Sequence, residues 1–229
     1  YMPWQNNITA MVYRKDLFEE KGIQVPKTWD EFLEAAKALT EDLDGDGKMD
    51  RYGCVFAGTR NDSAESRFQT FALTYGCDFV TENGDGTFTS GFGTDAYRNA
   101  MTSFIDLAAN KGVTPPGLIE TGYSEAYTMI AADQACMFFS ASNVLGGIYN
   151  ANPEMRGKMG SFRMPTAEGV DPVTSFSSVG MTVSSTCKNP EVAADFLKYM
   201  TSVDNSVTWN EATCRLPVVK DALTAICER

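Results

Sequence analysis

Acidic side chains alternate along one short stretch of the sequence. Asp42, Asp44 and Asp46 are spaced two apart, a glycine follows, and Asp50 lies further on. This spacing matches the first nine positions of a calcium loop of the EF-hand kind, where alternate carboxylates point inward at one hard cation and the glycine permits a sharp turn. The main-chain carbonyl of Lys48 would add an oxygen ligand. The sequence therefore predicts a structural Ca²⁺ ion held by these five residues.

The acidic stretch also fits a simpler interpretation. The twelfth position, where EF-hand loops carry a bidentate glutamate, is Gly53, so another carboxylate or water would have to complete the coordination shell. Asp-Gly-Asp-Gly is also a common composition of solvated turns. Carboxylates this close repel one another without a cation. That repulsion favours the calcium interpretation, with the ion pinning the loop.

Catalytic patterns are weak in the rest of the chain. There is no histidine, so the usual Ser-His-Asp and Cys-His arrangements cannot be built. No GxGxxG or Walker-type phosphate loop is present. The chain has 30 acidic residues, but no spacing among them marks the carboxylate pair of a glycosidase. The sequence predicts no catalytic residues and no organic cofactor.

Charge and hydropathy restrict the partners. The formal net charge is −11, and no Lys/Arg stripe is present, so nucleic acid and anionic membrane surfaces would be repelled on average. No apolar run reaches a membrane-spanning length, and no charged-then-apolar leader is present. The sequence starts at Tyr1 rather than Met, which indicates a processed or excised form.

Six scattered cysteines form no CxxC pair. Without histidine, a zinc site would need thiolates from distant segments, and nothing in the sequence supports one. Buried thiols and one or two disulfides remain equal alternatives. The cysteines are Cys54, Cys77, Cys136, Cys187, Cys214 and Cys227.

The clearest secondary structure lies between residues 13 and 40. Thr28, followed three positions later by Glu31, predicts a capping box at a helix start. Apolar residues then recur at spacings of three and four, from Trp29 to Leu39, as on the buried face of a helix. Residues 15–21 read as a shorter helix closed by Gly22.

Strands and helices alternate over the remainder. Predicted strands cover residues 8–13, 54–58, 135–139, 158–164 and 179–183, with a hairpin at 83–86. Residues 59–65 read as a polar loop, followed by an apolar helical run at 68–75. Further helices are predicted from Thr94, with a stripe including Ile105, from Ser124, and from Asn189, with a stripe including Val192 and Phe196. This alternation predicts an α/β domain with helices covering sheets.

Several of these segments together have a familiar order. The stretches YRKDLF (13–18), GI (22–23) and PKTWDEF (26–32) are followed by MP (164–165), VGMTV (179–183), KNPE (188–191) and LP (216–217). The ordered set resembles the extracellular solute-binding proteins of ABC sugar importers, family 1, of the maltose- and oligosaccharide-binding type.

The resemblance implies an architecture. It implies a type II periplasmic-binding-protein-like α/β fold, with helices flanking a mixed sheet, and one lobe plus part of the other. Residues 1–12 would form the hinge or crossover segment, 13–165 the α/β domain of the C-terminal lobe, and 166–229 a segment returning towards the N-terminal lobe. The family also has a first lobe before the position of Tyr1 and further helices after that of Arg229.

The resemblance also implies sugar-contacting positions. Sugar sites need aromatic faces, and amide, guanidinium or carboxylate groups for the hydroxyls. A ligand-contacting family loop corresponds to a polar stretch that offers Arg60, Asn61, Asp62, Glu65 and Arg67. For any one of these residues, an ordinary solvated loop is the alternative.

Other implied contacts come from outside that loop. Asn143 stands where many relatives carry the tryptophan of a Gly-x-Trp turn, and Phe176 with Ser177 matches a turn that faces the cleft. Trp4 and Asn7 would lie beside the cleft if the hinge assignment holds. Their alternative is a frayed terminus before a core strand.

The implied function is non-catalytic binding of a mono- or oligosaccharide and its delivery to ABC permease subunits. The implied location is extracellular, as a cell-surface lipoprotein or in the periplasm, with membrane attachment only through a lipid anchor outside these residues. Two rival functions remain: a calcium-stabilised carbohydrate-active enzyme domain, and a binding protein for a non-sugar solute.

Overall fold

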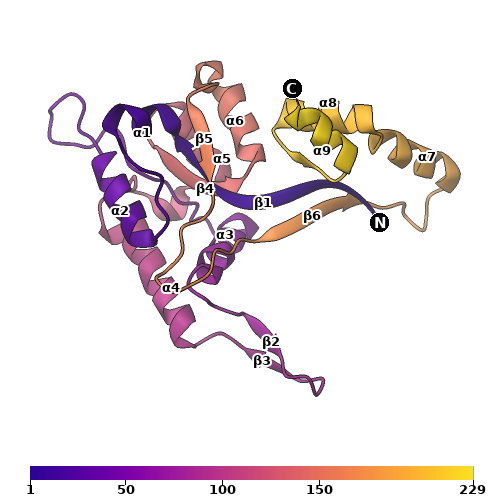
Figure 1. The fold of residues 1–229 in the computed structure, drawn as a ribbon, viewed down its shortest axis with the longest axis horizontal. Coiled ribbons are helices and arrows are strands. Elements are labelled where there is room, and N and C mark those ends of the chain that lie inside the picture. Colours follow the sequence, from indigo (N-terminus) through magenta and orange to yellow (C-terminus); the bar gives the residue numbers. More distant parts are fainter. Residues whose placement is uncertain (229) are drawn as a thin grey trace. The chain divides into compact units, whose positions relative to one another are not determined.

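The computed structural model describes residues 1–228, which form two compact units (Figure 1). The first unit contains Tyr1–Ile8, Ala141–Gly146 and the chain from Phe176 onwards; the second contains Thr9–Ser140 and Gly147–Ser175. Strand β1 (Met2–Arg14) contributes to both. The boundaries predicted at 1–12, 13–165 and 166–229 concern a complete binding protein and stay predictions.

The second unit is built on a small sheet. The C-terminal half of β1 lies between β4 (Met137–Ala141) and β5 (Met159–Phe162). It pairs with β5 antiparallel, with Met11 opposite Phe162. The prediction of a strand at 54–58 is wrong, because this buried segment belongs to no regular ladder. Its backbone is bonded on both sides, to Val113 and Met137, so hydrogen bonding is satisfied without a regular ladder.

Helices pack around this sheet. The capping box at the start of α2 (Trp29–Ala38) is confirmed, with Thr28 Oγ1 accepting from the Glu31 amide at 3.2 Å. The helix α1 (Lys15–Lys21) ends at left-handed Gly22, also as predicted. None of the helices within residues 1–228 is long and apolar enough to cross a bilayer. The helical segments between residues 62 and 155 are α3 (Asp62–Leu73), α4 (Asp95–Ile105), η1 (Asp106–Asn110), η2 (Leu118–Glu120), α5 (Tyr123–Ala131), α6 (Asn143–Ala151) and η3 (Pro153–Met155).

Aromatic rings form the centre of the core. Trp29 contacts Phe71 with ring centroids 4.4 Å apart, and Phe71 also packs edge-on against Phe104. The indole Nε1 of Trp29 donates to Thr74 Oγ1 at 2.8 Å, so its buried donor is satisfied. These rings join α2, α3 and α4, and Trp29 and Phe71 also contact Phe139 of β4.

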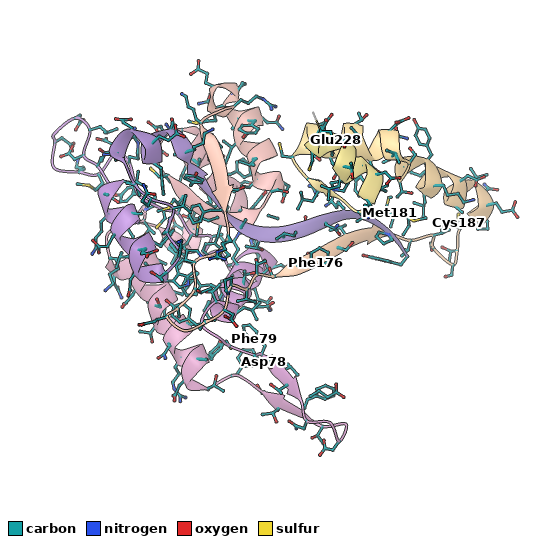
Figure 2. All side chains as sticks on the ribbon, in the orientation of Figure 1. Asp78, Phe79, Phe176, Met181, Cys187 and Glu228 are labelled. Atoms are coloured by element: carbon teal, nitrogen blue, oxygen red, sulfur yellow. The ribbon has the colours of Figure 1, made fainter. Side chains whose placement is uncertain are left out.

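The predicted hairpin is confirmed as β2 (Val80–Glu82) and β3 (Phe88–Ser90), with Asp78 and Phe79 at its base (Figure 2). The predicted stripe of the following helix is wrong at Ile105, which is 48% exposed. A π-helical turn follows directly after that residue. Ile105 lies before that turn, at the edge of the predicted stripe, whereas the buried side of this helical segment carries Ala100, Leu107 and Ala108.

The first unit pairs the N-terminal half of β1 with β6 (Phe176–Met181) and β7 (Leu216–Pro217). Its helices are α7 (Pro190–Met200), α8 (Val203–Thr213) and α9 (Lys220–Cys227). The helix from Pro190 forms as predicted, but its apolar stripe is not buried. Val192 is 69% exposed and Phe196 is 56% exposed.

All six cysteines are free thiols, so residues 1–228 contain no disulfide. Cys54, Cys77 and Cys136 are buried. Burial raises the pKa of Cys136 to about 12, although the charges of Arg51 and Arg14 act in the opposite direction. These buried thiols are neutral, apolar packing groups at ordinary pH.

Candidate ligand-binding site

The acidic loop follows α2 and is closed at its base by backbone pairing between Glu41 and Arg51. Inside it, the Asp42 carboxylate accepts from the amides of Gly45 and Gly47 at 2.7 and 2.8 Å. Both glycines have positive φ, which lets the chain turn sharply back on Asp42. Hydrogen bonds from the Gly47 and Gly45 amides hold the pKa of Asp42 below its usual value, so it stays ionised.

Three of the four predicted carboxylates converge. Single oxygens of Asp42, Asp44 and Asp50 lie within 4.8 Å of one another. Asp46 is not part of that group: its carboxylate accepts from the Lys48 amide at 2.8 Å and lies 3.7 Å from the Lys48 ammonium. The loop thus presents three oxygens suited to a hard cation. Its occupancy by calcium stays a prediction.

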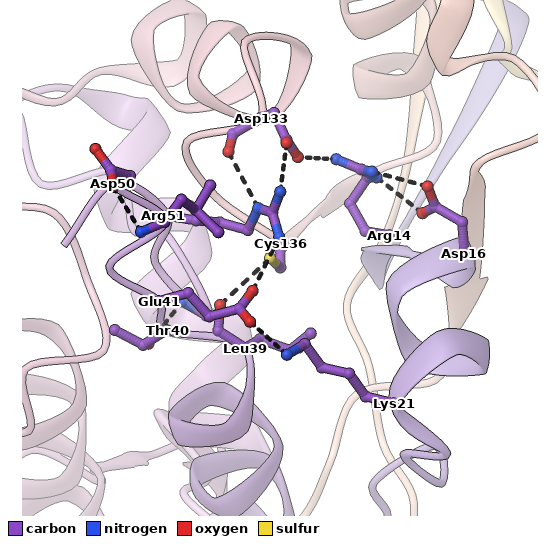
Figure 3. A network of polar contacts seen from close by, with 12 residues as sticks. Arg14, Asp16, Lys21, Leu39, Thr40, Glu41, Asp50, Arg51, Asp133 and Cys136 are labelled. Carbon is purple, nitrogen blue, oxygen red and sulfur yellow. Dashed lines mark hydrogen bonds and ion pairs between the residues drawn. The ribbon is translucent and has the colours of Figure 1, made fainter. Parts of the chain in front are cut away.

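Next to this loop, ion pairs link two arginines and three carboxylates in one series (Figure 3). Asp133 pairs with both Arg14 and Arg51. Arg14 also meets Asp16 at 2.7 Å, and Arg51 also meets Glu41 at 2.9 Å. Burial alone would lower the pKa of Arg14 and of Arg51, but hydrogen bonds and attraction from these carboxylates outweigh it and raise both pKa values. Each arginine therefore has its charge compensated within the unit.

The predicted ligand-binding loop is largely a helix instead. The helix α3 starts at Asp62, so Asp62, Glu65 and Arg67 are helical, and the prediction of a loop across 59–65 is wrong beyond Asn61. Asn61 is the N-cap: its Oδ1 accepts from the Ser63 amide, and its Nδ2 donates to Thr59. Asparagine is a favoured cap because its side chain satisfies an unpaired amide at the helix start. Asn61 is therefore the residue in the sequence that marks the start of α3.

One face of α3 is polar although it points into the protein. Ser63, Arg67, Thr70 and Thr74 are spaced by four, three and four residues, which places them in one stripe. Thr70 and Thr74 are fully buried. Thr70 Oγ1 lies 2.6 Å from the hydroxyl of Ser175. The stripe thus lines the second unit with hydroxyls and one guanidinium.

Arg67 is the centre of this stripe. Its Nη1 donates to the main-chain and side-chain oxygens of Ser63 at 2.7 and 2.6 Å, and its Nη2 donates to Ser140 Oγ at 2.8 Å. The guanidinium carbon lies 4.9 Å from the ring centre of Tyr123 and 5.1 Å from that of Phe138. Burial lowers the pKa of Arg67. We call these five residues the Arg67 cluster.

The other sequence candidates of the second unit lie outside the Arg67 cluster. Arg60 and Asp62 are exposed to solvent. Glu65 accepts a hydrogen bond from Gln69 at 2.9 Å on the exposed side of α3. Sequence reasoning singled out Arg67 but missed Ser140 and Tyr123, because both reach Arg67 only through the tertiary fold.

The remaining candidates belong to the first unit. Asn7 and Ser177 are opposite one another in the pairing of β1 with β6, and Phe176 is 63% exposed at the start of β6. Asn143 is the first residue of α6. Trp4 stacks on Trp209, with ring centroids 4.7 Å apart; Trp209 was not predicted, since no spacing marks it.

A broad groove lies elsewhere in the second unit. It has a volume of about 1020 Å³ and is lined by the connection between α1 and α2 and by one side of α2. None of the predicted contact residues lines it. Its position therefore gives no support to the predicted sugar contacts, which rest on the side chains described above.

Comparison with solved structures defines the class of fold as that of type II periplasmic binding proteins. A solute-binding protein from Thermotoga lettingae, solved with α-D-tagatose, superposes with a TM-score of 0.86 at 24% identity, over 100% of this chain and 57% of that one. The maltose-bound MalE3 protein of T. maritima gives a TM-score of 0.83 at 23% identity, over 99% and 57% of the chains. The predicted fold class is confirmed.

The family follows from the sequence match. The model for bacterial extracellular solute-binding proteins matches residues 1–206, and the chain belongs to this family, as the resemblance predicted. The putative ABC transporter periplasmic-binding protein YcjN of Escherichia coli is 26% identical over 95% of this chain and 47% of its own length. The polygalacturonan/rhamnogalacturonan-binding protein YtcQ of Bacillus subtilis is 37% identical over 44% of this chain and 20% of its own length. The chain thus spans about half, or less, of these curated relatives.

Proposed function

We propose that the protein is a non-catalytic receptor that captures a carbohydrate outside the cytoplasm and delivers it to the permease subunits of an ABC transporter. The observation that carries the proposal is the family match over residues 1–206. Relatives named for polygalacturonan and multiple-sugar binding, and neighbours solved with tagatose and maltose, favour a sugar as the solute.

The side chains of the second unit suit such a ligand. Ser63 and Arg67 of α3 offer a hydroxyl and a guanidinium that are partly exposed, and Tyr123 adds an aromatic ring beside them. Sugars need this combination, because their hydroxyls require polar partners and their C–H faces pack on aromatic rings. In this proposal, capture comes from two lobes closing around the ligand. Attachment to the cell surface comes from a lipid anchor outside the residues described.

A thermal-shift screen of the protein at its natural length against mono- and oligosaccharides tests the function. Binding to the folded state raises the unfolding midpoint, so one class of sugar should raise it in a saturable manner. Stabilisation by no sugar, with the protein folded, would contradict the proposal and favour a non-sugar solute. Turnover of a bound glycan would favour the rival enzyme domain instead.

We also propose that the acidic loop holds a structural Ca²⁺ ion. The convergence of Asp42, Asp44 and Asp50 supports it, with the Lys48 carbonyl as a further ligand and Asp46 as an outer partner. Because calcium would bind only the folded loop, a chelator should lower the unfolding midpoint of the protein, and Asp44→Ala should abolish that response.

The hairpin residue Asp85 provides the matched control for calcium. It lies in a similar Asn-Gly-Asp-Gly turn, where its carboxylate accepts from the Thr87 amide and hydroxyl. Asp85→Ala should leave the chelator response intact. An unfolding midpoint of the wild-type protein that is the same with and without chelator would show that the acidic loop is only a turn.

A further inference from the structure

We propose that the captured solute is an anionic sugar whose oxyanion group, such as the carboxylate of a uronic acid, binds to Arg67. This inference rests on the proposed function and specifies the class of sugar. It starts from a charge in the second unit that the unit itself does not balance.

Arg67 lacks an acidic partner in the part of the chain that the structure describes. None of the carboxylates within residues 1–228 forms an ion pair with Arg67. The nearest acidic residue on its own helix, Glu65, is bonded to Gln69. A partly buried cation is costly unless a negative group accompanies it. The aromatic faces of Tyr123 and Phe138 compensate only part of that cost.

The guanidinium of Arg67 also has hydrogen-bond donors that are not used within the described structure. A guanidinium has five N–H donors. The Nε of Arg67 is buried and has no acceptor in the described structure. Its other partners, Ser63 and Ser140, contribute neutral oxygens. Arg67 therefore has its full positive charge and at least one free donor.

The guanidinium of Arg67 is held in one orientation by its neighbours. Ser63 holds Nη1 from within α3, and Ser140 holds Nη2 from the end of β4, while two rings lie against the guanidinium. A planar group fixed in this way does not have to be ordered when a ligand arrives. Arg67 retains partial exposure to solvent. An arginine with these properties suits the planar, two-oxygen geometry of a carboxylate better than a single sugar hydroxyl.

The hydroxyls along the same face extend the site towards a sugar ring. Thr70 follows Arg67 by one turn of α3, and its hydroxyl meets that of Ser175, which lies 3.0 Å from the hydroxyl of Thr9. These groups both donate and accept hydrogen bonds. The charge at Arg67 would select the acidic group, and the partly exposed hydroxyls of Ser175 and Thr9 would suit the neutral remainder of the ligand, with the buried Thr70 hydroxyl holding that of Ser175 in place.

The test is isothermal titration calorimetry of the protein at its natural length with matched ligand pairs. Each pair shares one sugar and differs in charge: galacturonate and galactose, glucuronate and glucose, and short oligogalacturonides in free-acid and methyl-ester form. The acid should bind about 10- to 100-fold more tightly than its neutral partner, the range expected of a charge-assisted hydrogen-bonded pair. Glucose 6-phosphate distinguishes a phosphate from a carboxylate as the preferred oxyanion.

Variants then assign the preference to Arg67. Arg67→Met should remove the preference, so that the acid and its neutral partner bind with equal affinity, whereas Arg67→Lys should retain part of the preference, since it keeps the charge but not the planar fork. Arg98→Met is the matched control, because Arg98 is exposed and paired with Asp95. It should leave the preference unchanged.

The outcomes separate this inference from the proposed function. Equal binding of the acid and neutral forms by the wild-type protein, or binding of neutral sugars only, overturns the inference while the receptor function stands. An acid preference that survives in Arg67→Met also overturns it. Failure to bind any sugar, neutral or acidic, contradicts the receptor function and the inference together.

Discussion

Arginines occur in two contrasting settings within the second unit. The side chains of Arg14 and Arg51 are 6% and 11% exposed, and each meets two carboxylates. Arg67 meets serine oxygens and aromatic rings, and no acidic group of residues 1–228 pairs with it. The pKa values follow this difference: those of Arg14 and Arg51 are raised, whereas burial lowers that of Arg67.

The difference in pairing indicates a structural role for Arg14 and Arg51 and a ligand-binding role for Arg67. The charges around Asp133 are compensated internally, so the network can join α1, β1 and the acidic loop without any ligand. The charge of Arg67 is oriented but left uncompensated. Functional sites are commonly places where a group is held at a local cost that a ligand can offset. The same side chain type thus serves stability in one place and recognition in the other.

Removing the charge of Asp133, the carboxylate that Arg14 and Arg51 share, should have the largest effect on stability. Asp133→Asn should lower the free energy of unfolding by about 2–3 kcal/mol, because Arg14 and Arg51 both lose a charged acceptor. Asparagine tolerates the positive φ of 63° at this position, so the change isolates the charge. Urea unfolding measures the effect.

Asp95→Asn is the control for Asp133→Asn. Asp95 and Arg98 form an exposed pair, 90% and 63% accessible, whose loss should cost less than about 0.5 kcal/mol. Equal losses for the two substitutions would show that the network around Asp133 carries no special stability.

Replacing each arginine by methionine should give an intermediate contrast. Arg14→Met should lower the free energy of unfolding by about 2 kcal/mol, since Asp16 and Asp133 lose their donor. Arg67→Met should stay within about 1 kcal/mol of the wild type or exceed it, because an unpaired charge is replaced by an apolar side chain of similar length. Denaturant unfolding of both variants without ligand is the measurement. A larger loss for Arg67→Met than for Arg14→Met would identify Arg67 as a structural residue.

Acid should produce the smallest effect on this comparison, through Asp16 of the network. Burial tends to raise the pKa of Asp16, but the hydrogen bond and charge of Arg14 outweigh it, so the pKa is lowered. The resulting stabilisation is present above the unfolded-state pKa, about 3.9, and is lost as the pH falls through the lower folded-state value. Because Asp16 is one-third exposed, we expect less than about 1 kcal/mol.

Stability measured between neutral pH and the acid limit tests the role of Asp16. The variant Asp16→Asn should lose less stability on acidification than the wild type. The variant Arg67→Met should respond to acid as the wild type does, since no described carboxylate pairs with Arg67. An unchanged acid response in Asp16→Asn would contradict the assignment of the lowered pKa to the Arg14 pair.

Local signals explain which parts of the fold could be predicted from the sequence. The capping box at Thr28 and the hairpin at residues 83–86 depend on neighbours within a few positions, and both form as predicted. The start of α3 has a local signal too, the cap residue Asn61, but the polar composition of residues 59–65 is equally typical of a loop. The exposure of Ile105 could not be predicted, because apolar spacing alone does not show which edge of the stripe faces the core.

The candidate site depended on contacts between distant residues. Arg67 was identified as a polar group in a ligand-binding region. Its environment comes from Ser140, 73 positions away, and from Tyr123. The pairing of Asp133 with Arg14 spans 119 positions. No spacing rule could show that one arginine would be compensated and the other not, because that distinction arises only when the sheet and α3 pack together.

The most direct measurement is a crystal structure of the protein at its natural length with an acidic sugar bound. We predict an oxyanion of the ligand within about 3 Å of the Arg67 guanidinium, with Ser63 and Ser140 still holding that group in place. A bound sugar whose acidic group lies elsewhere, with Arg67 touching only the two serines and the two rings, would contradict it.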